Sequence, residues 1–445
     1  MKPVGQEAVQ VPDDHHSHSP QHSHQNYHQN SKFLRTVDKD VAVMRNHFGL
    51  DHLSWADMSP ILIPRGYTRN YIDQLDHHLT TTHGNASSKK TKSRILQALD
   101  NTQSKSDVVL CEGTGHCGVG SIVGANNAQV AAWMQAHMVL VANYGTDDNV
   151  DACIGTTVDE IELNRQLCDH YKVPVAGVIV NRIPTTRDNT ATSSIREQLD
   201  DVFERFWGAG SMPLLGCIPN NPASLQCLNV GDLQRALPKS YLLTPTTNNS
   251  HHHHFASDHV ELVETSLTTF METLRETQQR QDQKICANNC GPVFVCDATR
   301  DELLLGFVAE YQRQLRTART TAPNIGCLIV CGTDGQELSG GLFDMLQQQP
   351  SSSSSSSTQE ESHIPPILVA PHNAWQTMEC LRRYTPKHHS KDRQRVENAV
   401  AHMEPHIDLD KLLTHTGHLD ADGIAVTTRT TYGYEEVEDE AVAAI

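Results

Sequence analysis

The sequence predicts an α/β protein built from parallel sheets with helices on both faces, arranged as two domains in tandem. Three observations predict this class. Short, continuously apolar runs alternate with longer helical patterns, as in strands that are buried on both faces of a sheet. This alternation stops at a polar stretch near residues 245–258 and then restarts. The chain has 445 residues, which is too long for a single compact domain.

The first half of the chain supplies the elements of the first predicted domain. Apolar runs predict strands at 108–111, 138–142, 175–180 and 212–218. Helices are expected at 130–135, 157–170 and 194–206. Thr157, followed three residues later by Glu160, predicts a capping box at the start of the second of these helices.

The second half repeats the pattern. A helix over 258–280 is expected to connect the two domains. Strands are predicted at 293–296, 327–330 and 367–369, and helices at 300–316, 339–347 and 375–384. The strands are short and carry few charges, so we expect this half to pack against a partner or its own copy, giving a homo-oligomer.

Four segments have compositions that cannot bury enough apolar surface to offset the entropy of ordering. Residues 13–30 and 251–254 are rich in histidine, residues 347–362 are rich in Gln and Ser, and the last residues are acidic. The histidine tracts lack interleaved carboxylates and a fixed spacing. They are predicted to be disordered insertions, and metal binding is the alternative.

Net charge excludes two classes of partner. The chain has 35 Lys and Arg against 53 Asp and Glu, a formal net charge of -18. Its mean field repels phosphates, so general binding to nucleic acid or to anionic membranes is not expected, although a local anion site is compatible with it. Many of the cysteines lie in apolar runs like reduced core thiols, and no secretory signal is visible. A cytoplasmic location is predicted, with an organelle matrix as the alternative.

The most informative segment is the glycine cluster that follows the first apolar run. The run ends in Glu112, and Gly113, Gly115 and Gly118 follow before the next helix. This spacing matches the dinucleotide fingerprint, but that fingerprint needs an acid ending the next strand, and none occurs before Asp147. A second interpretation is an ATPase site, in which a carboxylate at a strand tip holds Mg²⁺ directly or through water. A glycine-rich turn beside a solvated Glu is the third interpretation.

The same segment resembles a known family. Residues 112–121, EGTGHCGVGS, resemble the "EGTGHxGVGS" segment of the dethiobiotin-synthetase-like P-loop domain, which forms the N-terminal part of long phosphate acetyltransferases and also occurs alone. Further matching segments are Lys2-Pro3-Val4-Gly5 and residues 37–40, 63–69, 159–165, 177–182 and 213–219. The resemblance implies a P-loop NTPase-like domain with a parallel sheet over residues 1–245, interrupted by the insert at 13–30.

The second half resembles the middle module of those proteins, the DRTGG domain. The matching segments are residues 297–301, 326–332 and 377–381. The resemblance implies a smaller α/β domain over residues 291–415 that contains the Ser-rich insert. A linker and bridging helix at 246–290 would precede it, and an acidic tail at 416–445 would follow.

The resemblance also implies roles for individual residues in binding ATP and Mg²⁺. Lys2, the implied catalytic residue, would stand near a phosphoryl or substrate carboxyl group as a point charge. Asp40 and Glu112 would hold Mg²⁺. Lys2 as a frayed terminal residue and Asp40 as a solvated loop acid are the alternatives.

The nucleotide itself would lie on the glycines and against the ends of two strands. Gly113, Gly115 and Gly118 would let the backbone approach the phosphates. Asn181 would read the edge of adenine, with Pro219 behind the base. The alternative for Asn181 is a turn former at the end of its strand.

One part of the family's machinery has no counterpart in the sequence. The phosphate loop G-x-x-x-x-G-K-[ST] needs a Gly followed by Lys, and this pair does not occur. In the family the loop lies one strand and one helix before "KPVG", which here begins at Lys2. The sequence therefore predicts that Met1 is an internal codon of the second strand, with the first strand, the phosphate loop and the first helix encoded upstream.

Two functions stay open at this point. The first is a nucleotide- or ligand-binding regulatory protein without catalysis, like the N-terminal sensing region of phosphate acetyltransferase. The second is an ATP- and Mg²⁺-dependent ligase similar to dethiobiotin synthetase, whose phosphate loop lies outside this sequence. The phosphotransacetylase domain, which carries acetyl-CoA chemistry, has no counterpart in the sequence either.

Overall fold

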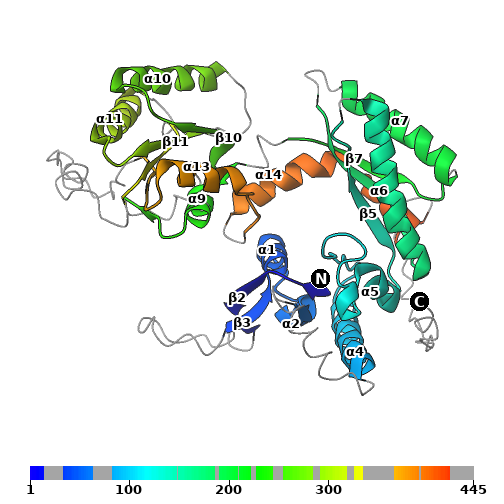
Figure 1. Ribbon diagram of the computed structural model, residues 1–445. Helices are drawn as coiled ribbons and strands as arrows, with labels where there is room; N and C mark the ends of the chain where they lie inside the picture. Colours follow the sequence, from blue (N-terminus) through cyan, green and yellow to red (C-terminus); the bar gives the residue numbers. More distant parts are fainter. Residues whose placement is uncertain are drawn as a thin grey trace. The chain divides into compact units, whose positions relative to one another are not determined.

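The structure is a computed structural model that forms two compact units. The residues that it describes are 1–14, 34–63, 83–147, 149–185, 190–208, 210–221, 227–243, 254–283, 291–317, 325–333, 365–389 and 392–420. The first unit consists of Met1–Val4, Arg65–Pro219 and Pro405–Ile445, and the second of Gly5–Pro64 and Asn220–Glu404. This division by contacts differs from the domain boundaries expected from the sequence. Figure 1 labels the elements of both units.

The first unit contains a three-stranded parallel sheet. Its strands, in order across the sheet, are β5 (Met138–Asn143), β6 (Val175–Ile183) and β7 (Leu214–Pro219). Leu140 lies opposite Val178, and Val180 lies opposite Cys217. All residues of β7 are buried, as the continuously apolar sequence predicts.

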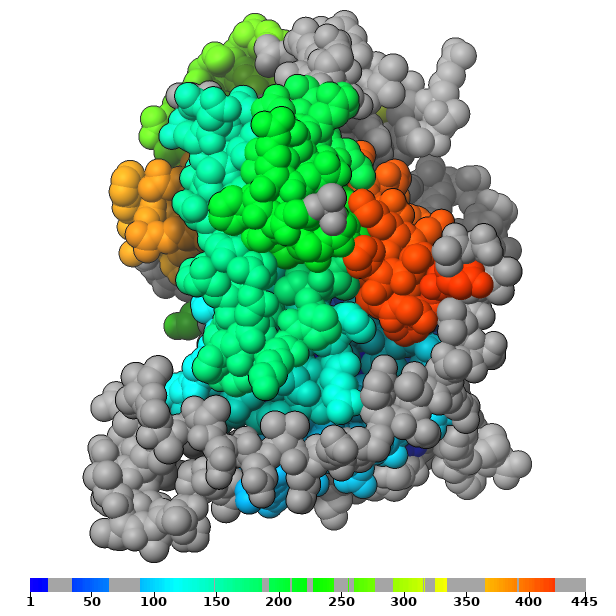
Figure 2. All heavy atoms as spheres, turned by 90° about the vertical axis from the view of Figure 1, so that its right-hand side faces the viewer, coloured from blue at the N-terminus to red at the C-terminus, as the bar shows by residue number. Residues whose placement is uncertain are grey.

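Helices pack on this sheet and close its core. They are α5 (Asn127–Met134), α6 (Val150–His170) and α7 (Thr190–Trp207). A further helix, α4 (His83–Gln103), packs against α5. Figure 2 shows α6 and α7 side by side on one face of the unit. Leu199 and Phe203 of α7 and Ile161 of α6 are at most 3% exposed and belong to one cluster with Val178 of the sheet.

A late segment of the chain returns to this sheet. Ile407 forms an antiparallel bridge with Gly216 of β7, and the Asp408 amide donates to the Leu215 carbonyl at 2.8 Å. The short helix α15 (Leu409–His415) follows and packs on β6 and β7, where it is coloured orange-red in Figure 2. A side chain at Gly216 would meet the His406 carbonyl oxygen at 2.6 Å, so glycine allows this close approach.

The second unit is built on a six-stranded sheet. Its strands, in order across the sheet, are β8 (Leu228–Asn229), β10 (His254–Leu262), β11 (Gly291–Asp297), β12 (Cys327–Cys331), β13 (Ile367–Ala370) and β9 (Tyr241–Leu242). The four central strands run parallel, and the two outer strands are antiparallel to their neighbours. The sheet therefore combines strands from both sides of the domain boundary expected near residues 245–258.

Helices cover both faces of this second sheet. They are α9 (Val230–Ala236), α10 (Leu267–Gln283), α11 (Asp301–Thr317) and α13 (Ala374–Arg383). The helix α14 (Arg393–Met403) follows α13 along the chain. On one face, Phe294 of β11 packs between Phe270 of α10 and Phe307 of α11, with its ring centroid 5.2 Å from that of Phe270. On the other face, Leu233 of α9 and Leu381 of α13 belong to a second cluster. The two layers explain why these strands are apolar throughout.

The remaining elements of the chain's first part form small sheets and two helices. They are β1 (Val4–Gly5), β2 (Ala8–Pro12), β3 (Leu34–Asp38), α1 (Lys39–Phe48), α2 (Trp55–Met58) and β4 (Ile61–Leu62). β2 and β3 pair antiparallel, and β1 pairs with β4. Arg45 of α1 stacks over the Trp55 ring at 4.0 Å and forms a 2.7 Å ion pair with Asp14.

The structure confirms the α/β class with parallel sheets. The strands expected at 138–142, 175–180, 212–218, 293–296, 327–330 and 367–369 are all present, with ends that differ by up to three residues. The helix expected at 339–347 and most of the low-complexity segments lie outside the described residues. Among the helices that the structure describes, none combines the length and the apolar composition needed to cross a membrane.

The predicted strand at 108–111 is wrong. These residues are described and are not part of a strand, and Leu110 is 79% exposed. The Met1 amino group donates to the Leu110 carbonyl and the Glu112 amide donates to the Met1 carbonyl, each at 2.9 Å. An apolar run becomes a buried strand only when a longer hydrogen-bonded ladder and a packed layer flank it, and this short pairing supplies neither.

Two expected helix starts are also wrong. Thr157 does not cap a helix, because α6 begins at Val150 with Asn149 as its N-cap, and the Thr157 hydroxyl donates to the Cys153 carbonyl inside the helix. The connecting helix expected over 258–280 begins only at Leu267, because the residues up to Leu262 belong to strand β10. Pairing with β11 outweighs local helical preference in that segment.

A buried network of charges lies at the side of the second sheet. Arg395, which is 2% exposed, forms ion pairs with Asp232 and with Asp392, the latter at 3.2 Å. Its guanidinium also donates to the Cys227 carbonyl at 2.6 Å. Burial acts to raise the pKa of Asp232, but the hydrogen bonds and charge of Arg395 outweigh it and hold that pKa below its usual value. Arg395 thus keeps a fully buried carboxylate ionised.

We expect a Glu162→Gln variant to have a lower free energy of unfolding than the wild type near neutral pH but not at strongly acidic pH. Hydrogen bonds from Arg165 lower the pKa of Glu162 to about 2, and the Trp207 indole adds a third bond at 2.8 Å. A lowered pKa contributes stability above the unfolded-state value of 4.5, and this is lost as pH falls toward 2. At this partly exposed site we expect the variant to be about 1 kcal/mol less stable at pH 6 and equal to wild type near pH 2.

Chemical denaturation at the two pH values measures this difference. Glu160→Gln, at an exposed position of the same helix, is the control. A deficit of the same size at both pH values would contradict the assignment of the stability to the ionised Glu162.

Candidate functional site

The glycine segment forms a loop that one side chain holds in place. Thr114 donates its amide to the Asn127 Oδ1 atom at 3.1 Å, and the Asn127 amide group donates to the carbonyls of Thr114 and His116, each at 2.9 Å. Gly115 has φ +63, in the left-handed region that favours glycine. A side chain at Gly113 would lie 3.0 Å from Asn127, so glycine lets the loop approach this anchor. The loop backbone is therefore preorganised at the start of α5.

Lys2 and Glu112 meet at the entrance to this loop. The Lys2 Nζ atom lies 3.2 Å from the Glu112 Oε1 atom, and the two side chains are 7% and 49% exposed. A buried ammonium group needs a carboxylate partner, because desolvation of an unpaired charge is costly. The Thr114 hydroxyl donates to the Val4 carbonyl at 2.6 Å and ties the same N-terminal segment to the loop. Lys2 is therefore fixed by specific partners and is not a frayed terminal residue.

The structure places Asp40 in the second unit, whereas Lys2 and Glu112 belong to the first. Asp40 lies in the first turn of α1 and forms a 3.5 Å ion pair with Lys39. Its neighbour Asp38 is 1% exposed and accepts hydrogen bonds from the amides of Gln6, Glu7 and Asp40. Asp38 is therefore the N-cap of α1, and its carboxylate accepts hydrogen bonds from backbone amides.

Asn181 and Pro219 lie at the carboxyl ends of neighbouring strands. Pro219 ends β7 and lies opposite Ile183, which ends β6 two residues after Asn181. β6 continues past the predicted end at residue 180, so Asn181 lies within the strand and pairs with Asn143. Its Oδ1 atom accepts the amide of Arg182 at 2.8 Å, and Arg182 has φ +63. The strand therefore bends directly after Asn181, which supports the alternative interpretation as a turn former.

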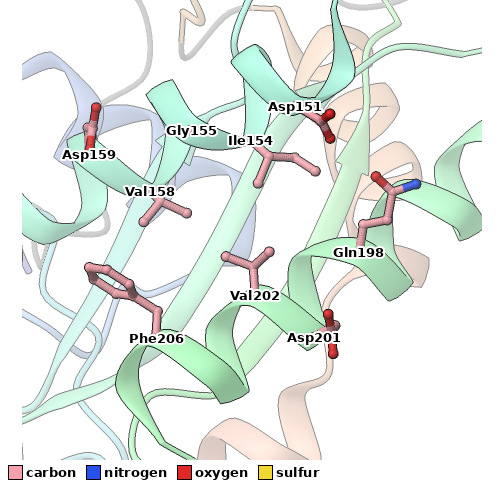
Figure 3. A pocket seen from close by; sticks show the side chains of 9 residues that line it. All are labelled: Asp151, Ile154, Gly155, Val158, Asp159, Gln198, Asp201, Val202 and Phe206. Atoms are coloured by element: carbon pink, nitrogen blue, oxygen red, sulfur yellow. The ribbon is translucent and has the colours of Figure 1, made fainter.

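A surface groove in the first unit lies apart from these residues. It has a volume of about 440 Å³ between α6 and α7 and contains none of the predicted site residues. Figure 3 shows Ile154 and Val158 of α6 directed toward Val202 and Phe206 of α7, with the carboxylates of Asp151, Asp159 and Asp201 around them. Acidic side chains around an apolar floor disfavour phosphate groups. The groove is not the candidate nucleotide site.

Two residues of the candidate site were missed by sequence reasoning. Asn127 anchors the glycine loop, and Asn164 of α6 accepts the Cys117 amide at 3.1 Å. Both act on the loop backbone through tertiary contacts. The glycines suggested a loop that needed support, but no local pattern identified the supporting side chains.

Mg²⁺ is usually held by one or two carboxylates together with phosphate oxygens of the nucleotide. Glu112 supplies one half-exposed carboxylate beside the loop, which fits this mode. Among the described residues, no group of three or more His, Cys, Asp or Glu side chains is arranged to hold a metal ion. The described residues therefore do not form a metal site from protein ligands alone.

A glycine-rich loop that leads into a helix beside a parallel sheet is an arrangement that can bind phosphate groups. Residues 22–226 match the model of a family described as an AAA domain, which is a dethiobiotin-synthetase-like P-loop family. The match covers the glycine loop and all three strands of the first unit. It supports a nucleotide-binding P-loop domain in this part of the chain.

Proposed function

We propose that this chain is a regulatory protein that binds ATP, with Mg²⁺, at the glycine loop of its first unit and does not catalyse a reaction itself. The observation that carries the proposal is the Lys2–Glu112 ion pair beside a loop already held by Asn127. The proposed role is that of a ligand sensor, like the N-terminal region of long phosphate acetyltransferases. The second half of the chain would act as its DRTGG-like module.

The charges at the loop suit a magnesium nucleotide. The Lys2 ammonium group would stabilise a phosphate oxygen as a point charge, and Glu112 would hold Mg²⁺ directly or through water. Bound Mg²⁺ would neutralise charge on the phosphates. The loop amides around Gly113 and Gly115 would face the phosphates, and Asn181 with Pro219 would contact the base.

The second candidate function is an ATP- and Mg²⁺-dependent ligase similar to dethiobiotin synthetase. The family match over residues 22–226 is to a dethiobiotin-synthetase-like P-loop family and is compatible with this function as well as with the first. Release of inorganic phosphate from Mg²⁺–ATP separates the two proposals. Stoichiometric binding without phosphate release supports the regulatory role, and sustained release supports the ligase.

A Glu112→Gln variant tests the proposed site. With Mg²⁺ present, we expect its affinity for a fluorescent ATP analogue to fall about tenfold, or about 1.4 kcal/mol, because the amide is a poor ligand for the metal. Without metal, its affinity should equal or exceed that of the wild type, because the variant lacks a negative charge that repels the phosphates. Titrations with and without Mg²⁺ measure both values.

Glu197→Gln is the matched control, because Glu197 is exposed on α7 of the same unit. It should bind the analogue like the wild type under both conditions. If Glu112→Gln weakens binding equally with and without Mg²⁺, Glu112 is a solvated side chain of a glycine-rich turn and the proposal fails.

A further inference from the structure

Two buried thiols are in contact beneath the glycine loop. Cys117 lies on the loop and Cys168 lies near the end of α6, and their Sγ atoms are 3.9 Å apart. Cys117 is 5% exposed and Cys168 is 0% exposed. The two residues are 51 positions apart in the sequence, so a bond between them would tie the loop to the helix.

The loop is already in close contact with α6 on both sides of this thiol pair. The Cys117 amide donates to Asn164 Oδ1 at 3.1 Å. A side chain built at Gly118 would lie 3.6 Å from Leu167, which is an ordinary packing distance. Gly115 and Gly118 flank the thiol and give the backbone the freedom to shift. The Sγ atoms can therefore approach without unfolding the helix.

The contact also distinguishes the two thiols chemically. The hydrogen bond from Cys168 lowers the pKa of Cys117, and the same contact raises the pKa of Cys168. The thiolate is the reactive form of cysteine. Cys117 is therefore the thiol of the pair that ionises more readily, and its neighbour His116 is exposed on the loop.

We propose that Cys117 and Cys168 form a reversible disulfide that fixes the glycine loop to α6. With a peroxide as oxidant, the Cys117 thiolate attacks one peroxide oxygen, and the sulfenic acid that forms is attacked by the Cys168 sulfur. The two thiols together lose two protons and two electrons, and hydrogen peroxide accepts them and is reduced to two water molecules. A dithiol reductant reverses the reaction.

The bond would change the shape of the loop. Its formation brings the two Sγ atoms from 3.9 Å to about 2.05 Å, so the loop and α6 must move closer together at this point. Residues 113–118 would then be drawn toward α6. The effect of the bond on ATP binding rests on the proposed function, whereas the bond itself does not. If the proposed function is correct, the oxidised protein binds ATP more weakly than the reduced protein.

Peptide mapping of the full-length protein tests the bond. After treatment with hydrogen peroxide and blocking of free thiols, trypsin places Cys117 in fragment 106–165 and Cys168 in fragment 166–172. We expect these two fragments to be linked, with a mass about 2 Da below their sum, and to separate on reduction. Free thiols at both positions, or links only to other cysteines, would overturn the proposal.

Variants assign the bond within the longer fragment, which also contains Cys111 and Cys153. Cys111→Ala and Cys153→Ala should keep the link, whereas Cys117→Ala should lose it. Cys168→Ala removes the other partner and should also lose the link. Agreement between the two variants shows that the loss does not come from a folding defect in one of them. Persistence of the link in Cys117→Ala would overturn the assignment.

Two further measurements separate this inference from the proposed function. Hydrogen exchange of residues 113–120 should slow about tenfold on oxidation in the wild type and stay unchanged in Cys168→Ala. Unchanged exchange in the linked protein would overturn the fixing of the loop. If the link forms and exchange slows but the reduced protein fails to bind ATP, the disulfide stands and the proposed function fails.

Discussion

Replacement of Arg395 by methionine is expected to destabilise the second unit by about 3–5 kcal/mol, because it removes the buried cation that pairs with both Asp232 and Asp392. Asp232 is 0% exposed and keeps a lowered pKa through Arg395, with Arg235 and Tyr384 as further donors. Methionine fills much of the space, so the loss would report the charge and not a cavity. Urea denaturation of the full chain measures the effect.

The control is Arg393→Met, two residues earlier, because Arg393 is 80% exposed and pairs with Glu397 on the surface. Exposed pairs contribute about 0–1 kcal/mol, so this variant should be close to wild type. The double variant Arg395→Met with Asp232→Leu removes both buried charges and should recover part of the loss. An equal loss of stability in the two arginine variants would show that Arg395 does not stabilise the buried charge network.

Replacement of Asn127 by alanine is expected to release the glycine loop and to weaken nucleotide binding about tenfold or more. The amide makes three hydrogen bonds to the loop backbone. Each is worth about 0.5–1.5 kcal/mol, so we also expect about 2 kcal/mol of lost stability. Hydrogen exchange at residues 114–116 should rise, and titration with the ATP analogue should show the lower affinity.

Gln97→Ala is the matched control, since it removes an amide from an exposed position on α4 of the same unit. It should leave both the exchange of the loop and the affinity unchanged. Faster exchange without loss of affinity in Asn127→Ala would show that the loop needs its anchor but that the nucleotide is bound elsewhere.

The strands that were predicted correctly share one property. The runs at 175–180 and 327–330 are apolar without interruption, and each lies between two other strands of its sheet with helices against it. The run at 108–111 has the same composition but lacks those neighbours among the described residues, and its Leu110 side chain is exposed. Composition therefore predicts which segments can form strands. Hydrogen bonding to neighbouring strands decides which of them do.

The start of α6 shows how a local signal can mislead. Thr157 and Glu160 have the spacing of a capping box, but Asn149, a strong N-cap residue, occurs earlier. The first turn after Asn149 has no clear apolar periodicity, so the sequence did not show that the helix had already begun.

The candidate site depends mostly on contacts between distant residues. The family resemblance gave Lys2 and Glu112 separate roles, and the structure joins them across 110 positions of sequence. The anchors Asn127 and Asn164 carry no motif of their own. The sequence therefore suggested candidate residues one by one, but not which of them pair or which side chains support them.

The path of the chain between the two units has a consequence for synthesis on the ribosome. The chain crosses from one unit to the other four times, and Ile407 and Asp408 join the sheet of the first unit only after residues 220–404 have been made. At about 5–20 residues per second, this interval lasts roughly ten to forty seconds. During that time Leu215 and Gly216 of β7 lack these later partners, so we expect chaperones that recognise exposed strands to contact this edge on the nascent chain.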